Sequence, residues 1–390
     1  MSVNFDRIID RRSTSDLKWR PEGLKGYLPI TVSDREIPMW IADMDVACPE
    51  CIVNAIHARA DKEIFGYCSY KSEYYDALKW WYGKRFSLDF DPARVSMMPT
   101  VVGAINMAIR AFSNPGDKVI IQQPVYEPFA GLIAKTGRVM VNNGLVYKDG
   151  RYEMDFDLLE AQAADPDTKI MILCSPHNPV GRVWTKEELT QVGEICKRNQ
   201  VFVVSDEIHS DIVYPGSVHT PFPLVSDAPH ILCTAPGKTF NVAGLRISNM
   251  LSSTLEIKQR YDQEISAYSF APPSTFGLEA VRAGYSPEGE AWLEELLTYL
   301  EGNVRLVESW AKEHHVGFTK PEGTFLGWLD FSTAGLSDGD VMRKIIVGQE
   351  VVCVPGPWFG KGGEGHLRLN IGCPRATLQE ALNRIGSVLK

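Results

Sequence analysis

The feature that most constrains the fold is a series of short, nearly continuous apolar runs with a helical segment between them. Residues 169–174 (KIMILC), 201–204 (VFVV) and 230–233 (HILC) are typical of strands that are buried on both faces of a sheet. Between the first two runs, residues 187–198 carry apolar side chains at helical spacing. Strand, helix and strand in this order predict βαβ units and a mostly parallel sheet.

The same alternation begins earlier in the chain. Residues 101–112 are apolar at helical spacing, and a turn at 114–117 (NPGD) leads into a β-branched strand at 118–121. The predicted fold is therefore α/β, with a mostly parallel central sheet that is flanked by helices.

The last hundred residues have a different character. Residues 288–313 are rich in Glu and Leu and predict one long helix, whereas 325–331 and 345–354 predict strands. We therefore expect a smaller α+β domain in this part of the chain. The predicted domains are a large one over residues 50–285 and a small one formed by residues 1–49 and 286–390.

The composition favours a soluble globular protein whose partner is neither nucleic acid nor a membrane. The 390 residues are 44% hydrophobic and carry a formal net charge of −9, whereas binding to a phosphate backbone needs clustered Lys and Arg. The first twenty residues lack the apolar core of a secretory signal, and no run of about 18 apolar residues is present. Several of the eight cysteines lie in apolar runs, so we expect reduced thiols and a cytoplasmic location.

One cysteine pair, Cys48 and Cys51, has the CxxC spacing that is found in redox and zinc sites. A zinc site needs four ligands, and the sequence offers no second CxxC and no HxxxH. Pro49 followed by residues 50–60 predicts instead the first turn of a helix. We interpret the pair as structural and predict no metal site.

Polar residues follow several predicted strands, at the edge of the sheet where ligands of open α/β folds bind. They are Tyr126, Asn178, Asp206 and Lys238. Each has an ordinary alternative interpretation: a half-buried aromatic ring, an Asn-Pro turn, a helix cap and a solvated surface lysine. Together, however, the four side chains match the parts of one cofactor, pyridoxal 5′-phosphate (PLP).

Each of these side chains suits a different part of PLP. Lys238 can hold the cofactor as a Schiff base, and Tyr126 can lay its ring on the cofactor face. Asp206 near the pyridine nitrogen would favour the protonated ring, which is the electron sink for a Cα carbanion. Asn178 can donate a hydrogen bond to the phenolate oxygen.

The phosphate and the substrate carboxylate require further donors and cations. Residues 99–103 (PTVVG) open a predicted helix, so Val101 and Val102 are expected at the phosphate. Arg246 can pair with the phosphate, and Arg368 can grip a substrate carboxylate in bidentate fashion. The alternative for either arginine is a surface ion pair.

Several strings of the sequence resemble the MalY/PatB group of fold type I (aminotransferase-like) PLP enzymes, which contains cystathionine β-lyases and cystalysin-type C–S lyases. The resemblance runs from about residue 5 to the end of the chain. Its most specific strings are SPHNPVGRVW at 175–184 and KTFNVAG at 238–244. The shorter shared strings are WIADMD at 40–45, FGY at 65–67 and SDEIH at 205–209.

The resemblance implies a role for each matching residue. Lys238 is expected to be the Schiff-base lysine, and Arg368, with Tyr126 and Asn178, to bind the substrate. His209 is expected near the phenolate oxygen. Tyr67 is expected to reach the phosphate of a neighbouring subunit, which implies a homodimer with shared active sites.

The implied reaction is α,β-elimination from L-cystathionine or a related S-substituted cysteine, which gives a thiol, pyruvate and ammonia. Lys238, once freed by the substrate amine, is the expected base for the Cα proton. An aminotransferase is the alternative enzyme. A regulatory or binding protein on the same fold is the alternative of another class.

Two positions depart from the group. Gly237 stands where a Ser or Thr usually precedes the lysine, and Glu127 stands where a second tyrosine often follows Tyr126. The sequence does not name the leaving thiol. We expect the specificity pocket to involve parts of residues 34–39, the region of Tyr126 and Glu127, and residues 355–359. Trp358 and Phe359 either line this pocket or pack the small domain, and we favour packing.

Overall fold

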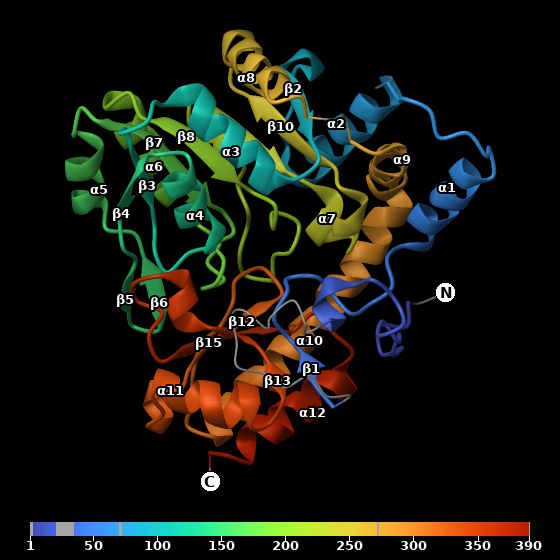
Figure 1. Cartoon of the computed structure of the whole chain (residues 1–390), viewed down its shortest axis with the longest axis vertical. Helices are drawn as coiled ribbons and strands as arrows, with labels where there is room; N and C mark the ends of the chain where they lie inside the picture. The colour runs from blue at the N-terminus through green and yellow to red at the C-terminus, as the bar shows by residue number, and fades with distance from the viewer. Residues whose placement is uncertain (1–2, 21–34, 70–71, 271–272, 390) are drawn as a thin grey trace.

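A seven-stranded sheet forms the centre of the computed structural model, which describes residues 3–20, 35–69, 72–270 and 273–389 (Figure 1). Its strand order is β2-β10-β9-β8-β7-β3-β4. In chain order these strands are β2 (Val95–Met98), β3 (Lys118–Ile121), β4 (Val139–Asn142), β7 (Thr168–Cys174), β8 (Phe202–Asp206), β9 (His230–Thr234) and β10 (Ser248–Ser252). Strands β9, β8, β7, β3 and β4 pair in parallel, whereas β10 pairs antiparallel with β2 and β9, so the mostly parallel sheet is confirmed.

Helices cover both faces of this sheet. One face carries α3 (Val101–Phe112), α4 (Pro128–Lys135) and α8 (Leu255–Ala267), and the other carries α5 (Phe156–Ala163) and α6 (Lys186–Arg198). Along β7, Ile170 and Ile172 pack in the cluster with α3, while Met171 and Leu173 pack in the cluster with α6. Because both faces are buried, the strand reads as a continuous apolar run.

A smaller sheet lies in the C-terminal part of the chain. It has the order β11-β12-β15-β14 and is antiparallel, with β11 (Gly317–Thr319), β12 (Leu326–Asp330), β15 (His366–Asn370) and β14 (Val354–Pro355). Strand β1 (Ile37–Pro38) pairs in parallel with β13 (Val351–Val352), so the N-terminal segment joins this part of the molecule. The domain boundaries themselves stay a prediction.

The predicted strand at 345–354 is wrong over its first half. Residues Val341–Val347 form a π-helical turn that continues α11 (Asp338–Asp340), and strand structure begins only at Val351. Ile345 and Ile346 are both fully buried, next to each other in sequence. A short apolar run of this kind has no period that separates a buried helical turn from a buried strand.

A helical layer connects the two sheets. It contains α1 (Glu50–Ala60), α2 (Ser72–Phe86), α9 (Thr275–Gly284), α10 (Pro287–Glu313) and α12 (Arg375–Gly386). Helix α10 confirms the predicted long helix, and it runs from α9 beside the large sheet to α12 beside the small one (Figure 1). An exposed hairpin of β5 (Val146–Lys148) and β6 (Arg151–Glu153) completes the strands.

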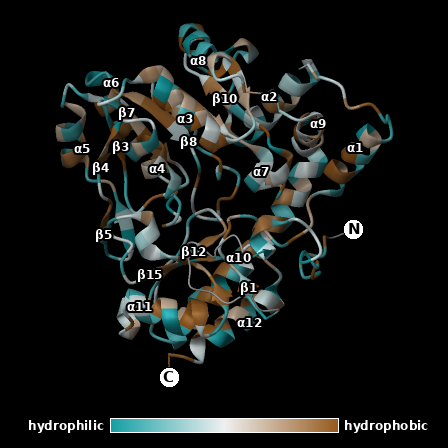
Figure 2. Ribbon diagram, viewed as in Figure 1, coloured by the Kyte–Doolittle hydropathy of each residue, from teal (hydrophilic) through white to brown (hydrophobic). Residues whose placement is uncertain are grey.

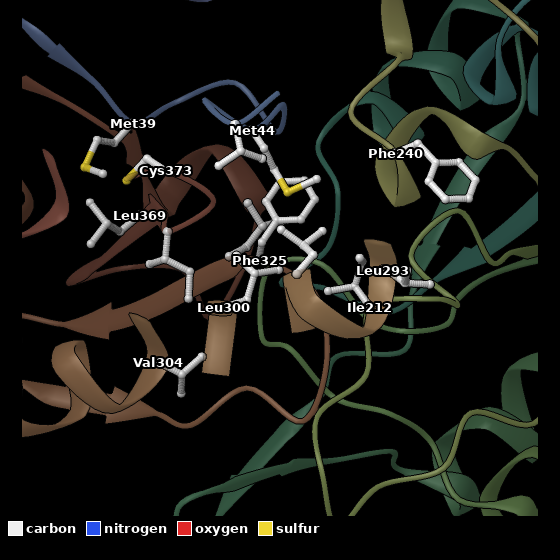
Figure 3. Packing of buried hydrophobic residues seen from close by; sticks show 14 of the residues in the cluster. Met39, Met44, Ile212, Phe240, Leu293, Leu300, Val304, Phe325, Leu369 and Cys373 are labelled. Atoms are coloured by element: carbon white, nitrogen blue, oxygen red, sulfur yellow. The ribbon is translucent and has the colours of Figure 1, made fainter. Parts of the chain in front are cut away.

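The core between the two sheets is built from both parts of the chain. Figure 3 shows Phe240 and Ile212 of the large part close to Leu293 of α10, and Phe325 and Leu369 of the small part beyond them. Apolar residues concentrate on the central strands, whereas the outer surfaces of α6 and α8 are polar (Figure 2). None of the helices within the described ranges has the length and apolarity needed to cross a bilayer.

Candidate active site

A cavity of about 340 Å³ opens at the carboxyl ends of the central strands. Strands β7 and β8 end there with Cys174 and Asp206, and β9 leads into Ala235. Eight of the ten predicted site residues line this cavity: Val101, Val102, Tyr126, Asn178, Asp206, His209, Lys238 and Arg368. The rule that ligands bind at this edge of an α/β sheet therefore located the cavity correctly.

Lys238 enters the cavity from α7 (Pro236–Thr239), a single helical turn after β9. Its Nζ donates a hydrogen bond to the carbonyl oxygen of Ala42. The pKa of Lys238 is lowered to about 8, chiefly by burial and also by the charge of Arg368, while the charges of Asp43 and Asp206 oppose the change. An amine with this pKa is partly neutral near physiological pH and can act as a nucleophile or a base.

Asp206 is a buried carboxyl at the end of β8, with only 4% of its surface exposed. Burial raises its pKa to about 7, although the backbone N–H of Ile208, 3.2 Å from Oδ1, and the charge of Lys238 act in the opposite direction. A cationic group placed beside Asp206 would hold it as the carboxylate. The protonated nitrogen of a pyridine ring is such a group.

His209 lies three residues further on and is also buried. Burial and the charges of Lys238 and Arg368 lower the pKa of His209 well below its ordinary value, so the imidazole is neutral. Its ring packs edge-on against Phe325 at 5.8 Å between centroids. Among the described residues, Nδ1 has no hydrogen-bond partner, which leaves a buried polar atom for a bound molecule.

Arg368 comes from β15 of the smaller sheet and is held on several sides. Nη1 donates to Oδ1 of Asn178 at 3.1 Å, and Nη2 donates to the carbonyl oxygen of Trp40 at 2.7 Å. The guanidinium lies 5.0 Å above the centre of the Phe359 ring. Nε is buried and has no partner among the described residues, so a positioned donor remains for a carboxylate.

The beginning of α3 forms the expected anion site. Thr100 caps the helix, accepting a hydrogen bond from the Gly103 N–H at 3.1 Å, and Val101 and Val102 provide first-turn N–H groups at the cavity. Gly237 also lines the cavity. A Cβ at Gly237 would lie 3.2 Å from Cα of Ala243, so this backbone approach leaves little room for a side chain.

Two predicted residues do not reach the cavity. Arg246 is exposed between Ala243 and Ile247, which do line the cavity, because the chain turns there through a left-handed conformation (φ 51°). Its phosphate role stays a prediction without support from the cavity lining. Tyr67 is fully exposed and lines a separate surface hollow with Arg59 and Tyr74. Its role at the phosphate of a neighbouring subunit stays a prediction.

The specificity prediction is partly wrong. Asp34 lies outside the described residues, and residues 35–39 do not line the cavity, whereas Trp40 does. Trp358 both lines the cavity and packs against the hydrophobic clusters, so the inclusion of residues 355–359 in the pocket holds at this residue. Phe359 packs as predicted, edge-on against Trp328 with 5.4 Å between the ring centroids.

The segment from Trp40 to Asp45 contributes to the site in a way that sequence patterns do not reveal. Its carbonyl oxygens at Trp40 and Ala42 hold Arg368 and Lys238. The buried Lys18 anchors the segment by donating to Oδ2 of Asp45 at 2.6 Å. Backbone acceptors carry no residue-type signature, so only the resemblance drew attention to this segment.

The cysteine pair shows no sign of activation. Cys48 and Cys51 are free thiols, and burial raises the pKa of each, which is the reverse of what a reactive thiolate needs. No group of three or more potential metal ligands occurs in the part of the chain that the structure describes.

Residues 38–385 match the model of the aminotransferase class I and II family, and this range contains the entire cavity. The chain belongs to this family. Aminotransferase class I and II membership agrees with the observed large α/β part, the smaller C-terminal part and the position of the cavity between them.

Similar members of the family can be named. Cystathionine β-lyase PatB of Bacillus subtilis (strain 168) is 40% identical over 393 residues, covering 99% of this chain and all of PatB. Protein MalY of Escherichia coli (strain K12) is 30% identical and covers 97% of each chain. The crystal structure of cystalysin from Treponema denticola, which contains PLP, is 33% identical with a TM-score of 0.94, covering 100% of this chain and 99% of cystalysin. The resemblance to the MalY/PatB group is confirmed.

Proposed function

We propose that this member of the aminotransferase class I and II family is a PLP-dependent C–S β-lyase. It cleaves L-cystathionine or a related S-substituted cysteine, and with one water the products are a thiol, pyruvate and ammonia. The observation that carries the proposal is the full-length similarity to a cystathionine β-lyase, in a chain whose cavity brings Lys238, Asp206 and Arg368 together.

The residues of the cavity fit PLP. The first-turn N–H groups of Val101 and Val102 would hold the phosphate, and the buried Asp206 would hold the pyridine nitrogen. Asn178 would donate through its amide to the phenolate oxygen, because its Oδ1 is already bonded to Arg368. Lys238 would bind the cofactor covalently, with Tyr126 at the ring. When bound, PLP supplies an electron sink for negative charge at the substrate Cα.

The side chains of this protein then have distinct tasks. Arg368 binds the α-carboxylate through the nitrogen that has no protein partner, which fixes the orientation of Cα. The neutral amine of Lys238 takes the proton from Cα. The Cβ–S bond breaks with its electron pair going to sulfur, and the sulfur leaves as the thiol after taking up a proton.

Omission of 2-oxo acids separates this function from transamination. The holoenzyme with an S-substituted L-cysteine is expected to release thiol and pyruvate in equal amounts when no oxo acid is present. Product formation that requires an added 2-oxo acid would show an aminotransferase instead. Failure of the purified protein to take up PLP would favour a regulatory or binding protein.

The low pKa of Lys238 predicts a distinctive pH dependence of cofactor loading. At pH 7 about one-tenth of an amine with pKa about 8 is neutral, against about 0.03% for an ordinary lysine. The rate at which PLP binds covalently to the apoprotein should therefore rise with pH and level off above about pH 8. The measurement is the absorbance of the lysine-bound cofactor from pH 6 to 10, with Nα-acetyl-lysine as the reference amine. A rate that climbs in parallel with this reference up to pH 10 would contradict the lowered pKa.

We also propose a cytoplasmic homodimer with shared active sites. The fully exposed Tyr67 and the neighbouring exposed Ile64 and Phe65 support an interface at this segment. The free state of all eight cysteines supports the location. A sedimentation mass that stays at the 43.5 kDa of one chain over micromolar concentrations would contradict the dimer.

A further inference from the structure

One charged group of the cavity has no task in the proposed reaction. Four lining residues in the described ranges carry a charged side chain: Glu127, Asp206, Lys238 and Arg368. The last three are needed at the cofactor, at the Cα proton and at the substrate carboxylate. Glu127 alone is left over.

Glu127 also lacks the structural role that its position offers. It occupies the N-cap of α4, where a carboxylate commonly accepts a backbone N–H, yet its side chain makes no capping hydrogen bond. Among the described residues it forms no ion pair and accepts no hydrogen bond. Burial raises the pKa of Glu127, and the charge of Arg368 lowers it. Glu127 is therefore an exposed carboxylate on the cavity lining that is unpaired among the described residues and lies within electrostatic reach of Arg368.

The loop that carries Glu127 is hydrogen-bonded to the loop that carries Trp358. The N–H of Val125 donates to the carbonyl oxygen of Phe359 at 3.0 Å, which ties the loop of Glu127 to the loop of Trp358. Trp358 and Trp40 also line the cavity, so aromatic side chains share this lining with Glu127. A carboxylate and aromatic faces together favour an alkyl chain that ends in a cation.

We propose that Glu127 selects S-substituted cysteines whose sulfur substituent carries a protonated amino group. This inference rests on the proposed β-lyase function and names the substrate class of the same site. The α-carboxylate binds at Arg368, and the distal ammonium group pairs with Glu127 at the mouth of the cavity. The reaction is unchanged: the Cβ–S bond breaks, and the products are an aminoalkyl thiol, pyruvate and ammonia.

A matched substrate pair tests the proposal. S-(3-aminopropyl)-L-cysteine and S-butyl-L-cysteine have nearly the same shape, but only the first carries a distal positive charge at pH 7.5. In the holoenzyme, Glu127→Gln should lower kcat/KM for the aminopropyl substrate about tenfold and leave the butyl substrate within about twofold. Activity on the butyl substrate also shows that the variant is folded. Glu313→Gln, an exposed substitution on α10 with the same change in net charge, should leave both values unchanged.

The outcomes separate this inference from the function on which it rests. Pyruvate from both substrates with equal losses, or no loss, in Glu127→Gln would overturn the role of Glu127 and leave the lyase function standing. A loss that Glu313→Gln reproduces would overturn it as well, because net charge would then be the cause. No pyruvate from either substrate with the wild-type holoenzyme would overturn the lyase function and this inference together.

Discussion

Replacing Lys238 with alanine is expected to lower kcat for pyruvate release by about 10⁴-fold. The variant loses the amine that removes the Cα proton and also the covalent link to PLP. The absorbance of the lysine-bound cofactor should disappear, even though the cavity residues Val101, Val102 and Asp206 are unchanged. Steady-state pyruvate release and the absorbance spectrum of the PLP-loaded variant measure the two losses separately.

A suitable control for this variant is Lys312→Ala, which removes an exposed lysine on α10 far from the cavity in sequence. It should keep both the activity and the spectrum of the wild type. Added methylamine should restore part of the activity of Lys238→Ala, because a small amine can occupy the space of the lost side chain. Near-normal turnover of Lys238→Ala without any added amine would refute the role of Lys238.

Replacing Asp206 with asparagine should lower kcat by about 10³-fold while the protein still binds PLP at Lys238. The amide has nearly the shape of the carboxyl, so packing at the end of β8 is preserved. It cannot hold a cation beside it, so the pyridine nitrogen would lose its proton and the ring would be a weaker electron sink. A fall in kcat with the lysine-bound cofactor retained is the expected signature.

The measurement for Asp206→Asn is kcat for pyruvate release together with the stoichiometry of bound PLP. Asp227→Asn is the matched control, since Asp227 is a surface residue whose side chain is 77% exposed. If Asp206→Asn kept most of its kcat with full PLP occupancy, the carboxylate would have no part in the electronics of the cofactor.

The central sheet and most of the cavity could be predicted from the sequence because their signals are local. The run at β7 is apolar because both its faces are buried, and the period of α6 places Leu189 and Val192 inward. Once parallel strands are predicted, topology brings their carboxyl ends together, and the polar residues Asn178 and Asp206 follow those ends.

The remaining features depend on contacts between distant parts of the chain. Ala42 contacts Lys238 through a backbone carbonyl, 196 residues away in sequence, and no side-chain pattern marks such an acceptor. Arg246 is exposed because its own backbone adopts a left-handed conformation. This conformation is uncommon for residues other than glycine, so the sequence does not predict it. The π-helical turn at Val341–Val347 is set by tertiary packing of its apolar residues and not by their period.

Pyruvate release from L-cystathionine by the PLP-loaded protein, with no oxo acid added, tests the β-lyase function most directly. We predict prompt pyruvate with an equal amount of free thiol. A change in the absorbance of the bound cofactor on addition of L-cystathionine, with neither pyruvate nor thiol released, would contradict cystathionine cleavage.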